Sequence, residues 1–207
     1  MTAENRNYDH FLTPDEEEEL VAFRHELHRH PELSGEETET AARVVAFVGR
    51  RGPDKVLTGL GGHGVAAIFE GAEPGPTLLV RSELDALPIQ ELSGLDYSSE
   101  TPGKAHLCGH DGHTTMLLGA AKYLAETRNF SGTVQFIFQP AEENEGGGKR
   151  MVEEGLFDKF PVDSVWGMHN WPGMPVGTVA VRPGPMMAAY DMFELDIKGV
   201  GGHGAMP

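Results

Sequence analysis

One short segment of the chain carries an unusual share of the side chains that can bind a metal ion. The sequence HLCGHDGH, residues 106–113, holds three histidines, an aspartate and the only cysteine of the chain, and an apolar stretch follows it. Such ligands suit borderline divalent ions such as zinc, or manganese, nickel and cobalt when more oxygen donors take part. The segment therefore predicts part of a metal site, in a loop just before a helix.

Further candidate residues lie where predicted strands end. Asp85 follows the strand-like run LLVRSE, Glu142 and Glu143 come directly after VQFIFQP, and His169 closes SVWGMH. Ligand sites in α/β sheets lie beyond the carboxyl ends of the strands, so we expect these side chains to converge at one edge of a sheet. The loop would add Cys108, His110, Asp111 and His113.

The adjacent glutamates can divide two roles between them. Neighbouring side chains in a loop point in different directions, so one glutamate can bind a metal while the other faces the metal-bound water. A metal lowers the pKa of that water, and a nearby carboxylate can then accept its proton as a general base. The pair Glu142 and Glu143 therefore favours metal-assisted hydrolysis.

Other readings of the same residues remain open from spacing alone. Cys108 and His110 can be a nucleophile and its base, although their spacing favours two side chains that reach one ion. Cys108 can also be buried and inert, His169 can be a structural residue, and AEENEG can be a solvated acidic turn. Four histidines receive no site role: His25, His28 and His30 are expected to be surface or packing residues, and His63 is unassigned.

Two helices precede all of these candidates. The sequence TPDE at 13–16 supplies an N-cap, a proline at the first helical position and a capping-box acid, which predicts a helix over residues 13–30. Pro31 ends it. Ser34, with Glu37 three residues later, predicts the N-cap of a second helix.

Strands and helices alternate in the rest of the chain. Short apolar runs between glycine and proline predict strands, and a helical period predicts a helix over 113–127 and a short one after the glycine-rich 145–155 segment. Alternation of this kind indicates an α/β domain with a central, largely parallel sheet flanked by helices. The predicted strands cover residues 64–71, 76–83, 132–140, 164–170 and 177–184.

The last segment differs from what precedes it. MFELDIKG, residues 192–199, alternates apolar and polar residues as an edge strand does, and a glycine-rich turn follows. We expect residues 1–190 to be the N-terminal part of one domain. Residues 191–207 would begin a second, smaller domain whose remainder is absent.

Composition narrows the possible partners and location. The formal net charge of −16 argues against nucleic acid and anionic membrane as partners, because both require a basic surface. One cysteine cannot form an intrachain disulfide, and no signal peptide or membrane-spanning apolar run is evident. The expectation is a cytoplasmic protein.

Six motifs together resemble the metal-dependent amidohydrolases of the aminoacylase type, a metallopeptidase family. These motifs are RHELHRHPELSGEE, LVRSELDALPIQE, HLCGHDGHTTMLLGAAKYL, FIFQPAEENEGGGKRMVEEG, GMHNWPGMPVGTVAVRPGPMMAA and IKGVGGHGAMP. Hippurate hydrolases, N-acetyl-diaminopimelate deacetylases and indole-acetyl-amino-acid hydrolases belong to this family. The resemblance covers almost everything from Phe23 to Pro207.

The resemblance implies a zinc-peptidase-like catalytic domain with two divalent metal ions, and a smaller α+β lid domain that also forms the dimer. Glu142 would be the catalytic acid/base, Asp85 would orient or polarise a ligand, and the lid residue His203 would bind substrate or stabilise an oxyanion. The implied metal ligands are Cys108, His110, Glu143 and His169.

The implied reaction is hydrolysis of the amide bond of an N-acyl amino acid. The metal-bound water would lose its proton to Glu142 and attack the acyl carbonyl, and Glu142 would then protonate the departing amine. The chain departs from the family pattern at Glu83, where Asp is usual, and at Val200 and Gly204, where Lys and Ala are usual. The family also continues beyond this length, so the alternative is a truncated, inactive fragment that retains partial metal binding.

Overall fold

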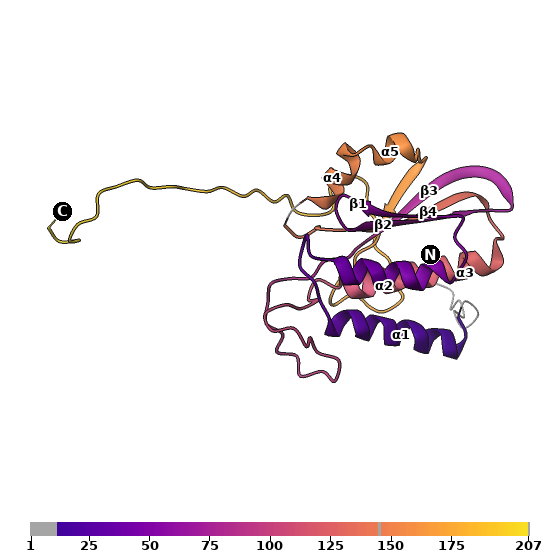
Figure 1. Cartoon of the computed structure of the whole chain (residues 1–207), viewed down its shortest axis with the longest axis horizontal. Coiled ribbons are helices and arrows are strands. Elements are labelled where there is room, and N and C mark those ends of the chain that lie inside the picture. Colours follow the sequence, from indigo (N-terminus) through magenta and orange to yellow (C-terminus); the bar gives the residue numbers. More distant parts are fainter. Residues whose placement is uncertain (1–11, 145, 207) are drawn as a thin grey trace. The chain divides into compact units, whose positions relative to one another are not determined.

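A single mixed β-sheet forms the centre of the first of two structural units (Figure 1). The computed structural model describes residues 12–144 and 146–206, and the units are Met1–Asn170 and Trp171–Pro207. The described strands lie in the order β1-β2-β4-β3-β5, with β4, β3 and β5 parallel and β1, β2 and β4 antiparallel. Their bounds are Lys55–Leu60, Gly64–Glu70, Glu73–Glu83, Ser131–Gln139 and Ser164–Gly167 for β1 to β5.

Helices cover both faces of this sheet, which confirms the predicted α/β class. Figure 1 shows α1, α2 and α3 on one face and the short α4 and α5 on the other. The two faces follow the alternation of side chains along β2, since Val65 and Phe69 join the larger core cluster and Ala66 joins the smaller one. The helices α1 to α5 span Pro14–Arg29, Thr38–Gly49, His110–Thr127, Gly147–Glu153 and Leu156–Lys159.

The predicted strands at 64–71, 76–83 and 132–140 are confirmed, the one predicted at 164–170 is shorter and ends at Gly167, and one strand was not predicted. β1 forms the antiparallel edge of the sheet beside β2. Its six residues are exposed or only partly buried, so its sequence KVLTGL lacks the continuous apolar character that identifies the buried strands. The three parallel strands β4, β3 and β5 are the ones that carry the candidate site residues at their ends.

The first helix begins as predicted, and the second does not. Thr13 and Glu16 form the expected capping box of α1. The prediction that Ser34 caps the second helix is wrong, because α2 begins only at Thr38 and its N-cap position is Glu37. The chain first turns at Gly35, which has φ +80°, and the Ser34 hydroxyl donates instead to the carboxylate of Asp85.

The free N–H groups at the start of α2 have a different acceptor. The side chain of Glu32 accepts hydrogen bonds from the backbone N–H of Thr40 at 2.7 Å and of Glu39 at 3.2 Å. Glu32 therefore performs the capping that the sequence pattern had assigned to Ser34. The Ser34 hydroxyl is therefore free to donate its hydrogen bond to Asp85, a candidate site residue.

The second unit contains no helix or strand among its described residues, 171–206. An isolated bridge pairs His203 with Met206, and the remainder is turns and extended chain. The predicted strands at 177–184 and 192–199 are therefore wrong for this structure. Their apolar side chains are largely exposed, and a strand pattern becomes a strand only when a neighbour satisfies its backbone.

None of the helices in the described part of the chain has both the length and the apolar character needed to cross a bilayer.

Replacement of Glu32 by Ala should lower the free energy of unfolding by about 1 kcal/mol, because two backbone N–H groups of α2 lose their acceptor. Chemical denaturation followed by circular dichroism measures this change. The matched control is Glu36→Ala, which removes the same charge from the same loop but only a surface pair with Lys104. Equal effects of the two substitutions would contradict the capping role of Glu32.

Candidate metal centre

The side chains that follow β3, β4 and β5 meet the first residue of α3 at one edge of the sheet. Three overlapping groups of described residues place potential ligand atoms within 4.8 Å of one another, and His110 belongs to each of them. The predicted convergence of the four chain segments therefore occurs. The groups are Cys108–His110–His169, His110–Glu142–Glu143 and Glu83–His110–His113.

The imidazole ring of His110 is buried and oriented by Asp85. His110 Nδ1 lies 2.8 Å from the backbone carbonyl oxygen of Asp85, so Nδ1–H donates to that oxygen. The opposite nitrogen, Nε2, faces carboxylate oxygens of Glu143 at 3.7 Å and of Glu142 at 3.8 Å, and it has no hydrogen-bond partner among the described residues. A ring held in this way presents a lone pair to the space between the strand ends.

The carboxylate of Asp85 joins three segments of the chain. It is fully buried, and its Oδ2 accepts hydrogen bonds from the Ser34 hydroxyl at 2.7 Å and from the Glu143 backbone N–H at 2.9 Å. Burial alone would raise the pKa of Asp85, but His110, the Glu143 N–H and Ser34 together hold it below the ordinary value. Asp85 therefore stays ionised and links the position of His110 to that of Glu143. Its role in orienting a metal ligand stays a prediction.

The thiol of Cys108 lies 3.4 Å from His169 Nε2, and His169 Nδ1 lies 2.7 Å from the carbonyl oxygen of Asn170. Burial raises the pKa of Cys108 to about 12, and the negative charges of Glu143 and Glu142 act in the same direction. The thiol is then protonated at neutral pH, which argues against the cysteine-nucleophile reading. A cation in this position would reverse that effect and hold a thiolate.

The residues present fit a divalent metal ion. His110 Nε2 and Glu143 Oε1 are buried without a hydrogen-bond partner among the described residues, and both lie beside the Cys108–His169 pair. Sulfur, nitrogen and oxygen donors together suit zinc and the neighbouring transition metals. Which of these side chains bind the metal stays a prediction.

Sequence reasoning gave no role to a second layer of contacts behind these ligands. Glu83 accepts a hydrogen bond from His113 Nδ1 at 2.9 Å and pairs with Arg81. On the other side of its ring, His113 Nε2 accepts the backbone N–H of Asn170 at 3.1 Å, the residue that holds His169. The sequence signal for Glu83 is its place at the end of β3, two residues before Asp85.

Asp111 does not join the convergent groups. Its side chain is buried on another side of α3, where Oδ2 lies 2.9 Å from His28 Nδ1 and 3.1 Å from Arg24 Nε. Adjacent helix positions point in different directions, so His110 and Asp111 cannot both face the strand ends. His28, expected at the surface or in packing, is a buried partner of Asp111 and Glu91. His203 belongs to the second unit.

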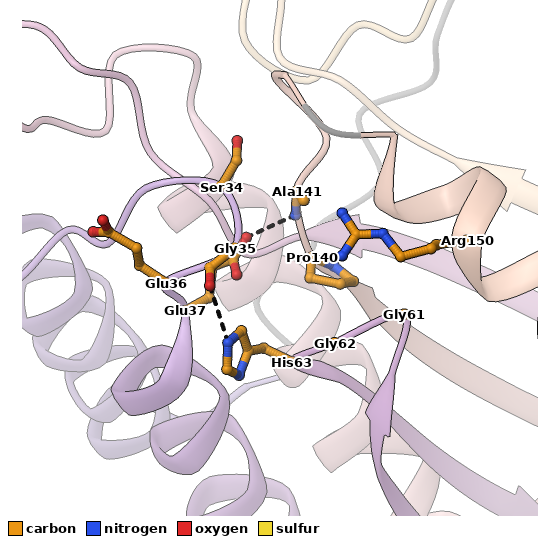
Figure 2. Close-up of a pocket in the computed structure, with 10 residues that line it drawn as sticks. All are labelled: Ser34, Gly35, Glu36, Glu37, Gly61, Gly62, His63, Pro140, Ala141 and Arg150. Carbon is orange, nitrogen blue, oxygen red and sulfur yellow. Dashed lines mark hydrogen bonds between the residues drawn. The ribbon is translucent and has the colours of Figure 1, made fainter.

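A cavity of about 320 Å³ lies between the turn that precedes α2 and the residues that follow β4 (Figure 2). Its lining includes Ser34, which contacts Asp85, and Ala141, which precedes Glu142. None of the candidate ligands lines it, so the cavity is separate from the convergent groups.

The glycine between Cys108 and His110 is required by its surroundings. Gly109 has φ +103°, and a Cβ atom there would lie 2.3 Å from the Asn170 side-chain oxygen. Only glycine permits this turn and the close approach of the segment that carries His169.

Comparison with known proteins agrees with this geometry. The family profile of peptidase family M20/M25/M40 matches residues 79–205. The chain is 42% identical over 189 residues to the N-acetylcysteine deacetylase of Bacillus subtilis, covering 91% of this chain and 49% of that protein. It is also 42% identical over 189 residues to the hippurate hydrolase of Campylobacter jejuni, with the same two shares.

Solved structures lead to the same family. The YXEP protein of Bacillus subtilis, described as a dinuclear metal-binding peptidase of the M20 family, superposes with a TM-score of 0.77 at 40% identity, covering 81% of this chain and 46% of that one. The fold thus matches the catalytic domain of this class of metallopeptidases. The chain belongs to peptidase family M20/M25/M40. It spans about half the length of the curated relatives that it matches.

Replacement of Gly109 by Ala should weaken Co²⁺ binding by at least about tenfold, because the methyl group displaces Asn170 and with it His169. Titration of the metal-free protein, followed by the cobalt–thiolate absorption, measures the affinity. Gly103→Ala is the control, since Gly103 has φ +75° with open space around it and suffers backbone strain alone. Equal weakening in both variants would show that backbone strain, and not the contact with Asn170, lowers the metal affinity.

Proposed function

We propose that the protein hydrolyses the amide bond of N-acyl amino acids, with divalent metal held by side chains of the convergent groups. The observation that carries this proposal is the meeting of a thiol, two further imidazoles and three carboxylates around His110, within a family whose members include N-acyl amino acid deacetylases. The ligands that we assign are Cys108, His110, Glu143 and His169. Their donor set admits zinc, manganese, nickel or cobalt, and the relative described as dinuclear favours two ions.

Glu142 and Glu143 have different roles: Glu142 transfers the proton, and Glu143 binds the metal. The Glu143 side chain is 18% exposed, and its Oε1 is buried without a hydrogen-bond partner among the described residues, whereas the Glu142 side chain is 38% exposed. Burial, reinforced by the charges of Glu143 and Glu83, raises the pKa of Glu142. A carboxylate with a raised pKa is a stronger base, which suits Glu142 to proton transfer and leaves Glu143 to bind.

The reaction follows from these roles. A bound divalent ion would polarise the acyl carbonyl and acidify a neighbouring water. Glu142 accepts a proton from the attacking water as its oxygen forms the new bond to the carbonyl carbon. Glu142 then delivers that proton to the amide nitrogen as the C–N bond breaks, so the products are a carboxylic acid and a free amino acid. Asp85 holds His110 and Glu143 in fixed positions relative to each other during the reaction.

We also assign a role to the second unit. Residues 191–207 begin a lid domain in which His203 binds the substrate or stabilises the oxyanion, and this domain forms the dimer. The resemblance of IKGVGGHGAMP to the family motif supports this assignment.

Glu142→Gln should abolish turnover while metal content stays unchanged, because an amide is nearly isosteric but cannot accept the proton. Glu143→Gln should lower metal content itself. Elemental analysis beside assays with N-acetyl and N-benzoyl amino acids separates the two roles. If metal content falls equally in both variants, the assigned division is wrong.

Exhaustive dialysis against a chelator should remove hydrolysis of N-acyl amino acids, and readdition of Zn²⁺, Mn²⁺ or Co²⁺ should restore it. Turnover that survives complete metal removal would overturn the proposed function. Stoichiometric metal binding by a folded protein that hydrolyses no member of the substrate panel would favour a metal-binding module instead.

A further inference from the structure

We propose that Glu37 is a positioning residue, whose buried carboxyl group holds the turn at Ala141 and thereby sets where Glu142 and Glu143 point. This inference rests on the proposed function of the glutamate pair. It concerns a residue that does not touch any of the assigned ligands and that the sequence pattern indicates only as part of a helix start.

The backbone at Ala141 adopts a conformation that residues with a Cβ rarely take. Ala141 has φ +50°, in the left-handed region, and it is completely buried directly before Glu142. Because this conformation is unfavourable for alanine, surrounding contacts have to hold it. The direction in which the next two side chains leave the strand depends on this turn.

Two hydrogen bonds hold the peptide groups of Ala141. Its N–H donates to Glu37 Oε1 at 2.7 Å, as Figure 2 shows, and its carbonyl oxygen accepts the N–H of Gly147 at 2.9 Å. A Cβ on Gly147 would lie 1.9 Å from the Pro140 carbonyl oxygen, so the loop is closed tightly on that side. Glu37 provides the restraint on the other side, from 104 positions earlier in the chain.

The carboxyl group of Glu37 is unusual for a group with only a structural role. It is fully buried, and its Oε2 has no hydrogen-bond partner among the described residues. Burial raises the pKa of Glu37, although backbone N–H groups, including that of Ala141, oppose this effect. Burying such a group is costly, which points to a specific requirement for an acceptor at this place.

Packing alone does not hold the turn. The cavity of about 320 Å³ in Figure 2 is lined by Glu37, Pro140 and Ala141, so the turn has space to move into if its hydrogen bond is lost. The buried carboxylate of Asp85 holds the backbone two residues later, because it accepts a hydrogen bond from the N–H of Glu143. Glu142 therefore lies between two residues whose backbone N–H groups are held by Glu37 and Asp85.

The test is a double-mutant cycle of Glu37 with Ala141. Glu37→Leu removes the acceptor, and should lower kcat by about 30-fold with little change in KM, because the base is displaced while binding persists. Glu37→Gln keeps an acceptor oxygen and should retain most of kcat. In the Ala141→Gly background the left-handed turn costs little, so Glu37→Leu should then lower kcat by less than about fivefold.

Thr40→Val is the matched control, since Thr40 is a buried residue in the first turn of α2 and its hydroxyl has no hydrogen-bond partner among the described residues. Should Glu37→Leu not fold, Glu37→Ala gives the same comparison. Equal losses from Glu37→Leu and Glu37→Gln, or an undiminished loss in the Ala141→Gly background, would overturn the proposal.

A readout independent of turnover keeps the two proposals distinguishable. Hydrogen exchange of the Ala141 amide, followed by NMR, should be slow in the wild type and in Glu37→Gln and at least about tenfold faster in Glu37→Leu. Unchanged exchange in Glu37→Leu would overturn the positioning role even in an active enzyme. The predicted exchange pattern in a protein without amidase activity would support it while the proposed function fails.

Discussion

The buried carboxylate of Asp85 is the constraint on which the candidate site depends. A charge removed from water is costly unless donors surround it. This carboxylate accepts hydrogen bonds from Ser34 before α2 and from the Glu143 backbone. The His110 ring, which donates to the Asp85 backbone carbonyl, lies 3.2 Å from the other carboxylate oxygen. These three groups come from three different segments of the chain. The same contacts that satisfy the charge therefore fix the mutual positions of an imidazole and a carboxylate at the sheet edge, and loss of any donor would disturb the others.

The surroundings of His110 have an excess of negative charge. Glu83, Asp85, Glu142 and Glu143 all approach this ring, and the pKa of His110 is raised because Asp85 and Glu83 outweigh the lowering effect of burial. Arg81 pairs with Glu83 and also lowers the pKa of Glu142, so it compensates part of this charge. A proton on His110 is one way to balance the charge, and a divalent cation is another. The two compete for one nitrogen, so metal binding should weaken as the pH falls through the raised pKa of His110.

The α/β class and the convergence of the strand ends could be predicted, because both follow from local patterns: buried apolar runs, and polar residues at the points where those runs stop. Contacts between distant segments could not. Glu32 rather than Ser34 accepts the hydrogen bonds at the start of α2, because the chain turns at Gly35. Asp111 lies outside the site, because helix geometry directs its side chain toward His28. At 177–184 and 192–199 the local pattern predicts strands that do not form. A strand needs a neighbouring strand, and the described residues of the second unit do not supply one.

The parallel arrangement of β4, β3 and β5 has a consequence for how the protein is made. Parallel neighbours need long crossover connections, so the chain must travel through α3 and then through α4 and α5 before the strand ends come together. Cys108 and His169 meet only across 61 positions of sequence. During synthesis Cys108 leaves the ribosome well before His169, and β5 is the last of the described strands to do so. The candidate site is thus complete only late in synthesis, and a metal ion would bind all of its ligands only then.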